Sequence, residues 1–218
     1  MERLPAVDGH TLSWPQLVAD RLFSMRAFVA ATKAEAEKRA TIGPSPELCS
    51  PHLTLGGCGC ALSHRRAWQR LVDSQRSWAL ILEDDVAKMC EDFDGELDRV
   101  LEDLPEGWKL CYLGFHTGSL LPRGAHFRGP LIRLDEGGAW LAGLWAYLIS
   151  RPWAQTLLER TFPMDVQVDT AVGLLGAEEK GIYAVPPNEF LLFSPTTERS
   201  RDTDVQTFPG RVRPKCDG

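Results

Sequence analysis

The sequence predicts an α/β protein with a mostly parallel sheet and helices on both faces. Three apolar runs without polar alternation, at 78–82, 108–115 and 140–150, are typical of strands that are buried on both faces. Helix-favouring segments separate these runs and follow them, at 92–104, 151–160 and 168–180. Strands that alternate with helices in this way favour a parallel sheet covered on both sides.

The composition is that of an ordinary globular protein. The chain has 218 residues, 44% of them hydrophobic and 25% charged, and a net charge of −6. No basic cluster with interleaved aromatic residues is present, so we expect no nucleic-acid partner. The longest apolar run, 139–149, is shorter than the ~20 residues of a spanning helix, so we expect no membrane span. We expect one domain over 1–193 and a polar, loosely ordered tail over 194–218.

The segments before residue 60 predict a strand, a helix and a loop in turn. Residues 4–9 favour a short strand that ends at Asp8-Gly9, because Asp-Gly is a strong turn signal. Residues 27–40 are rich in Ala, Glu, Lys and Arg and favour an exposed helix. Residues 41–55 contain three prolines and favour a loop.

A helix is predicted over 60–72, because His64, Trp68 and Leu71 recur at helical spacing on one apolar face. This position favours a buried core histidine at residue 64, and a role in binding stays open beside it. We expect Trp68 to pack this helix against the sheet.

The later elements continue the alternation. Pro105 ends an acidic amphipathic helix over 92–104, and the glycine-rich segment 116–138 is predicted to be a loop. Ser150 is the expected N-cap of a helix that runs to residue 160. A helix over 168–180 closes at Gly181, and a short strand follows over 182–185.

The first apolar run leads directly into three carboxylates, Glu83, Asp84 and Asp85. Adjacent carboxylates repel one another, and a hard divalent cation such as Mg²⁺ or Mn²⁺ would relieve that repulsion through oxygen ligands. Such a cation could hold a phosphate-bearing substrate at the carboxyl end of a strand, where open α/β sheets bind ligands. A solvated acidic turn is the alternative that this stretch leaves open.

The six cysteines do not predict a zinc site. Cys58 and Cys60 lie near His52 and His64, but the second pair of ligands that a structural zinc site usually shows is missing. We therefore expect buried free thiols.

An ordered set of motifs resembles glycosyltransferase family 25, which includes bacterial lipooligosaccharide galactosyltransferases and animal collagen galactosyltransferases. The matching pieces are A-V-D-G at 6–9, G-C-A-L-S-H at 59–64 with Trp68, A-L-I-L-E-D-D-V at 79–86, Y-L-G at 112–114, A-Y-L-I-S at 146–150 and V-D at 168–169. The resemblance covers roughly residues 4–193. No single motif decides the matter, but their order is specific.

The resemblance implies a Rossmann-like fold of the metal-dependent GT-A type. It implies inverting transfer of a hexose, with galactose as the expected sugar, from a uridine diphosphate (UDP) sugar to a hydroxyl of a glycan or protein acceptor. It also implies Mn²⁺, or Mg²⁺, on Asp84 and Asp85. The compartment stays open: cytoplasm for a bacterial protein, or the lumen of the ER and Golgi for a eukaryotic one with a further N-terminal segment.

The resemblance also suggests roles for individual residues. Asp169 is the expected general base for the acceptor hydroxyl, and Asp165 is the second choice. Both could instead be helix caps or solvated loop residues, and Asp8 could be only a turn former. Contacts to the donor are expected from a larger set: Asp8, Ser63, His64, Glu83 and Asp84.

Two departures from the family pattern leave a second function open. The chain begins after the strand and helix that usually precede the A-V-D-G turn, so we expect the fold to lack its first strand-helix unit and turnover to be weak. Gly57 stands where the family pattern has Glu. An active sugar transferase is therefore one hypothesis, and a catalytically degenerate member that acts as a binding or adhesion module is the other. A metal-dependent phosphohydrolase is a distant third.

Overall fold

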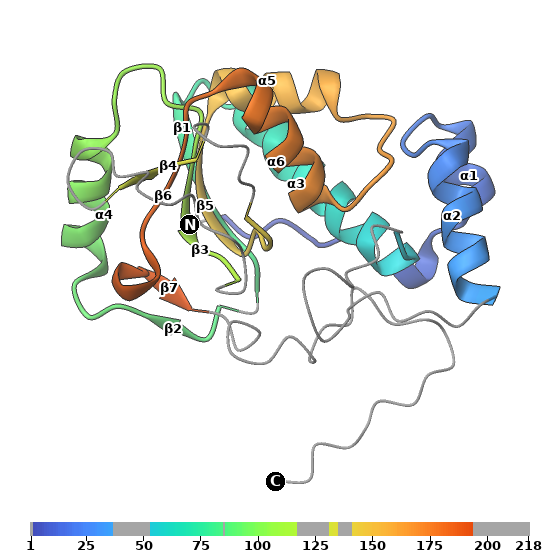
Figure 1. Cartoon of the computed structure of the whole chain (residues 1–218), viewed down its shortest axis with the longest axis horizontal. Coiled ribbons are helices and arrows are strands. Elements are labelled where there is room, and N and C mark those ends of the chain that lie inside the picture. Colours follow the sequence, from blue (N-terminus) through green and yellow to red (C-terminus); the bar gives the residue numbers. More distant parts are fainter. Residues whose placement is uncertain (1, 37–52, 85, 117–130, 135–140, 194–218) are drawn as a thin grey trace, which may run out of the picture.

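The computed structural model describes residues 2–36, 53–84, 86–116, 131–134 and 141–193 (Figure 1). Asp85 and the expected tail over 194–218 lie outside these ranges. The helices are η1 (Gly9–Thr11), α1 (Trp14–Ala19), α2 (Met25–Ala36), α3 (Leu55–Asp73), α4 (Phe93–Asp103), α5 (Arg151–Arg160), α6 (Val168–Glu179) and η3 (Pro187–Glu189). The strands are β1 (Trp78–Leu82), β2 (Lys88–Met89), β3 (Leu110–Gly114), β4 (Ile132–Arg133), β5 (Ala146–Ser150), β6 (Ile182–Ala184) and β7 (Leu192–Phe193).

The predicted α/β class is confirmed, but the prediction of a mostly parallel sheet is wrong. The main sheet has the order β1-β5-β3-β6-β4, and only β3 and β6 pair in parallel; the other three pairs are antiparallel. Strands β1 and β3, joined through α4, do run in the same direction, as a strand-helix-strand unit requires. Strand β5 enters between them in the opposite direction, which makes both of its pairings antiparallel.

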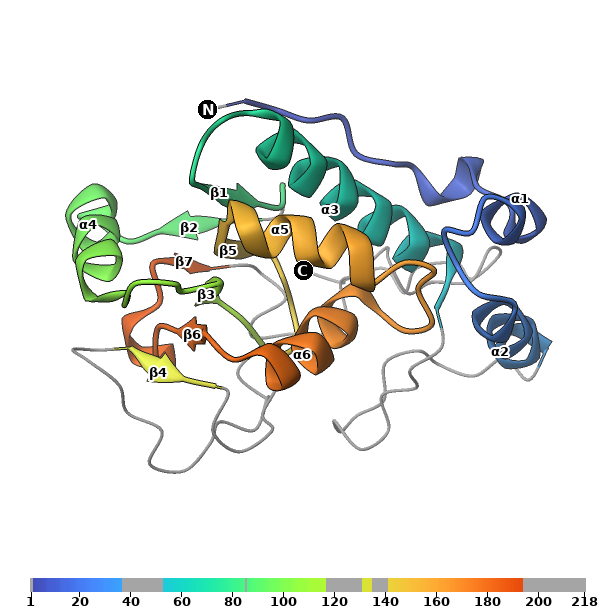
Figure 2. The same cartoon turned by 90° about the horizontal axis from the view of Figure 1, so that it is seen from above.

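Helices lie on both sides of this sheet. Helices α3, α5 and α6 are on one side and α4 is on the other, in both views (Figures 1 and 2). Strands β3 and β5 are almost entirely buried between them. Strand β1 was expected to be buried on both faces; instead it lies at the sheet edge, and all five of its residues are half-buried, because within the described part of the chain only β5 pairs with it.

The expected strand at 4–9 is absent from the described residues, although the turn that ends it is present as η1. This segment runs along α3 instead, where the Val7 backbone N–H donates to the Ser63 hydroxyl at 2.9 Å. The contact depends on glycine, because a Cβ at Gly59 would lie 2.5 Å from the Val7 carbonyl oxygen and one at Gly9 would lie 2.5 Å from that of Leu55. Side chains between the two segments are therefore excluded.

Helix α3 begins at Leu55, five residues before the predicted start. Three glycines in its first turns lower the helix propensity of this segment and conceal the true beginning. Thr54 caps the helix by accepting a hydrogen bond from the Gly57 N–H at 3.0 Å. Among the helices that the structure describes, none combines the length and apolarity that crossing a membrane would require.

The predicted end points of α4, α5 and α6 agree with the structure to within a residue or so. Ser150 caps α5 as predicted, and its hydroxyl oxygen accepts a hydrogen bond from the Trp153 N–H at 3.4 Å. Residues 37–40 of the helix predicted over 27–40 lie outside the described residues. Within the predicted loop 116–138, the structure describes one short strand, β4, and sequence reasoning did not predict β2 or β7 either.

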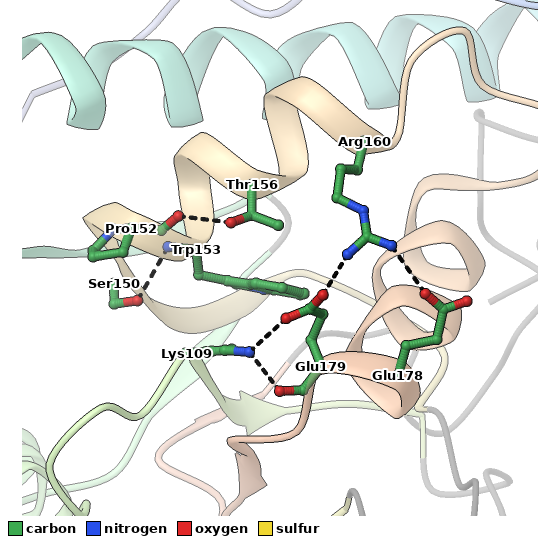
Figure 3. Close-up of polar contacts among 8 residues, drawn as sticks. All are labelled: Lys109, Ser150, Pro152, Trp153, Thr156, Arg160, Glu178 and Glu179. Atoms are coloured by element: carbon green, nitrogen blue, oxygen red, sulfur yellow. Dashed lines mark hydrogen bonds and ion pairs between the residues drawn. The ribbon is translucent and has the colours of Figure 1, made fainter.

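A polar cluster joins Lys109, the residue before β3, to α5 and α6 (Figure 3). The Lys109 ammonium group lies 5.2 Å from the ring centroid of Trp153 and donates hydrogen bonds to both the carboxylate and the backbone carbonyl of Glu179. Arg160 pairs with Glu179 and, at 3.0 Å, with Glu178. The cluster satisfies a carbonyl at the C-terminus of α6, where a cation is favourable.

This cluster predicts a pH dependence of stability. Hydrogen bonding and charge from Lys109, followed by hydrogen bonding from Arg160, lower the pKa of Glu179 below its ordinary 4.5. A lowered folded-state pKa stabilises the fold above pH 4.5, and this contribution is lost as the pH falls through the folded value. Solvent screens this exposed group, so we expect a small effect.

We therefore expect Glu179→Gln to reduce stability at neutral pH and to make no difference at a pH well below 4.5. Urea unfolding at the two pH values measures this. Glu178→Gln is the matched control, since within the described ranges Glu178 pairs with Arg160 alone. An equal loss from Glu179→Gln at both pH values would contradict the prediction.

Candidate functional site

The acidic end of β1 meets the beginning of β5 and the end of β3. Leu82 and Gly114 both pair with Ala146, the first residue of β5. The Glu83 backbone N–H then donates to the Trp145 carbonyl at 2.8 Å, which fixes the chain as it leaves β1. The Glu83 side chain is 34% exposed and Asp84 is exposed, so the two carboxylates lie at the surface of one sheet edge.

A buried chain of hydrogen bonds leads from α3 through β5 to Glu83. The Trp68 indole N–H donates to the Tyr147 hydroxyl at 2.9 Å, and that hydroxyl lies 2.8 Å from Nδ1 of His64. Nε2 of His64 lies 2.9 Å from Oε1 of Glu83. Trp68, Tyr147 and His64 are all buried, which confirms the predicted inward face of this helix and the packing of Trp68. The expected contact of His64 with the donor stays a prediction.

Sequence reasoning missed Tyr147. The residue was read only as part of a buried apolar strand, although a buried tyrosine hydroxyl needs a polar partner, and that requirement was an available signal. Burial raises the pKa of Tyr147 well above its ordinary 10.0, against the opposing effect of the Trp68 hydrogen bond, and the Glu83 charge raises it further. The phenol therefore keeps its proton at neutral pH.

Asp169 lies in the first turn of α6 and holds the segment that leads into β5. Its Oδ2 accepts a hydrogen bond from the Gly143 N–H at 3.1 Å, and its Oδ1 accepts one from the Thr170 N–H at 2.7 Å. Gly143 adopts a φ of +91°, which favours glycine, and lies two residues before Trp145, the partner of Glu83. Segment 141–145 thus connects Asp169 to the acidic end of β1.

Comparison with known proteins identifies the family. The sequence profile of glycosyltransferase family 25, described as an LPS biosynthesis protein, matches residues 5–118, just over half of the chain. The chain belongs to glycosyltransferase family 25. It is also 36% identical over 64 residues to a glycosyltransferase 25 family member of Aedes aegypti, a match that covers 28% of this chain and 10% of the mosquito protein.

The matched segment of this family 25 chain includes α3, the acidic end of β1 and the end of β3. Tyr147 and Asp169 lie beyond it. The structure therefore adds two groups to the matched part of the site: the hydroxyl behind His64 and the carboxylate beside segment 141–145.

Three other residues predicted to act in family 25 chemistry make contacts of their own. Asp8 is exposed and caps η1, where its Oδ1 accepts from the His10 N–H at 2.8 Å. The Ser63 hydroxyl accepts from the Val7 N–H and donates to the Gly59 carbonyl at 2.8 Å. Asp165 is exposed, accepts a hydrogen bond from Ser24 and lines a groove between α2 and α6. These contacts give Asp8, Ser63 and Asp165 local structural roles. Their roles in donor binding or catalysis stay predictions.

The cysteines of this family 25 chain include one that approaches the site. Cys58 and Cys111 are buried free thiols, as predicted, and burial alone raises the pKa of Cys58 to about 12. Cys60 is half-buried, and its sulfur lies within 4.8 Å of the ligand atoms of both His64 and Glu83. Sequence reasoning considered Cys60 and His64 together but did not predict Glu83 as their neighbour. Cys49, Cys216 and His52 lie outside the described residues.

Proposed function

We propose that this chain is an inverting, metal-dependent glycosyltransferase that moves a hexose, with galactose as the first choice, from a UDP-sugar to an acceptor hydroxyl. The single observation that carries the proposal is the family 25 match over an acidic strand end whose first carboxylate is held by a buried histidine. The acceptor class proposed is a glycan or a protein.

The carboxylates at the end of β1 are suitable ligands for a hard metal ion. Within the described residues, Oε2 of Glu83 accepts no hydrogen bond, and Asp84 is exposed beside it. Mn²⁺ and Mg²⁺ prefer such oxygen ligands. We assign the ion to Asp84 and Asp85, with help from Glu83; the assignment of Asp85 rests on the sequence. Such an ion would neutralise the charge of the departing diphosphate.

Asp169 is our choice of general base. It lies at a helix N-terminus and holds segment 141–145, whose last residue, Trp145, accepts the Glu83 backbone N–H. To accept a proton from the acceptor hydroxyl, one of its oxygens must come within hydrogen-bond reach of that hydroxyl. Asp165 is the less favoured alternative, because it bonds to Ser24 in the groove beside α2.

A transfer assay tests the proposal. The full chain would be incubated with several UDP-hexoses and Mn²⁺, with β-galactoside or hydroxylysine-type acceptors, and with a chelator in a parallel reaction. We expect chelator-sensitive release of UDP and a glycosylated product, greatest with UDP-galactose. Saccharide binding without turnover of any donor would instead favour a catalytically degenerate binding module.

We further predict that Asp84→Asn and Asp85→Asn each weaken Mn²⁺ binding in the presence of UDP by at least about tenfold, because each removes a charged ligand. Calorimetric titration measures this directly. Asp73→Asn, which neutralises an exposed carboxylate at the end of α3, should bind Mn²⁺ as the unaltered chain does. Equal binding by all four proteins would reject this metal assignment.

A further inference from the structure

We propose that Tyr147 is a positioning residue for Glu83: its hydroxyl fixes His64 in the tautomer that donates from Nε2, so that Glu83 presents its other oxygen at the acidic end of β1. The inference rests on the proposed function only where it concerns metal and nucleotide. The arrangement of the hydrogen bonds stands by itself.

The donor and the acceptor of each hydrogen bond follow from which atoms carry a proton. The Trp68 indole nitrogen can only donate, so the Tyr147 oxygen accepts from it. The phenol proton then needs an acceptor, and among the described residues the other polar neighbour of that oxygen is Nδ1 of His64. An accepting Nδ1 carries no proton, which places the ring proton on Nε2. Nε2 therefore donates to Oε1 of Glu83.

Cys60 raises the alternative of a soft metal ion such as Zn²⁺ on Cys60, His64 and Glu83. A metal on Nε2 would move the ring proton to Nδ1. The Tyr147 oxygen would then face two donors, Trp68 and His64, and neither of them could accept the phenol proton in this buried position. An unpaired buried hydroxyl is costly, so the hydrogen-bond chain is favoured over the metal.

These hydrogen bonds join two separate elements, α3 and β5, to one carboxylate. Trp68 and His64 lie on α3, Tyr147 lies on β5 beside β1, and the Glu83 N–H is fixed by Trp145, the residue before β5. Consecutive donors that all point toward a carboxylate strengthen one another in a dry interior. Glu83 is therefore restrained at both its backbone and Oε1, while Oε2 remains available to a ligand.

Nitrogen NMR of the imidazole rings tests the tautomer without any assumption about activity. Long-range ¹H–¹⁵N spectra of the full chain would be recorded at neutral pH, with the His64 signals assigned through His64→Gln. We expect the Nε2–H tautomer in the unaltered chain and its loss, or a mixture of tautomers, in Tyr147→Phe. A His64 that carries its proton on Nδ1 in the unaltered chain would overturn the proposal.

Calorimetry tests the consequence for the site. We expect Tyr147→Phe to weaken Mn²⁺ binding in the presence of UDP by about 10–100-fold, the range typical of residues behind metal ligands. Tyr183→Phe, which removes the hydroxyl of a buried tyrosine on β6, should leave binding unchanged. Unchanged binding in Tyr147→Phe would overturn the positioning role. Trp68→Phe, which removes the N–H donor to Tyr147 and keeps an aromatic ring at this position, is a second variant should Tyr147→Phe not fold, with a smaller loss expected.

Two further results distinguish this inference from the proposed function and from a soft metal site. Absence of Mn²⁺ and UDP binding in the unaltered chain would reject the proposed function, and the tautomer of His64 would still decide the hydrogen-bond chain. Titration with Co²⁺ tests whether Cys60, His64 and Glu83 bind a soft metal ion. A thiolate-to-Co²⁺ absorption band that Cys60→Ser abolishes would show that they do, and would overturn the proposal.

Discussion

Replacing Trp68 by alanine should lower the free energy of unfolding by about 3–5 kcal/mol. The side chain is fully buried between α3 and the sheet, so its removal leaves a large cavity. It also removes the N–H donor to Tyr147 from a dry environment. Denaturant unfolding followed by circular dichroism measures the change, and the slope of the transition should stay the same if the native state keeps its compactness.

The control for Trp68→Ala lies next to it on the same helix. Gln69 is exposed, and in the described part of the chain its side chain bonds only to Asp73, one turn further along, so Gln69→Ala should change stability by no more than about 0.5 kcal/mol. If Trp68→Ala costs less than about 1 kcal/mol, the buried position of this residue is wrong. Because a loss of 3–5 kcal/mol approaches the whole stability of many domains, Trp68→Phe provides a milder variant.

If the chain transfers sugar as proposed, Asp169→Asn should lower kcat by about 10²–10⁴-fold and change donor affinity little. The reason is that a general base acts mainly in the transition state. An asparagine keeps the size of the side chain and one oxygen acceptor, so it can still hold either Gly143 or Thr170. The measurement is steady-state kinetics with saturating acceptor, together with calorimetric binding of the donor.

Asp165→Asn is the matched control for catalysis. Asp165 precedes the same helix and is exposed to solvent, but it bonds to Ser24 beside α2. We expect its kcat to be close to that of the unaltered chain. A large loss in Asp165→Asn with an unchanged kcat in Asp169→Asn would exchange the two roles. Equal losses of stability and activity in Asp169→Asn would show that this carboxylate only holds segment 141–145.

Local patterns in the sequence predicted the parts of the site that belong to single elements. The spacing of His64, Trp68 and Leu71 gave the buried face of α3, and the apolar run before Glu83 located a strand end. The order of motifs gave the family, which the profile match over 5–118 supports. These features are local, since helical periodicity and strand ends are written in neighbouring residues.

Pairing between distant segments was decided only by the tertiary structure. Nothing in the apolar run at 146–150 says that it enters between β1 and β3 in the opposite direction, yet this insertion makes the sheet mixed and puts β1 at its edge. The same insertion brings Tyr147 beside His64, and the contact of Asp169 with Gly143 joins α6 to that edge. The sequence by itself determined which side chains are carried by each helix and strand, because those positions follow from local repeat. Which of these side chains meet was determined by the packing of β5 against β1, β3 and α3. Strand partners are chosen by burial and register across long separations in the chain.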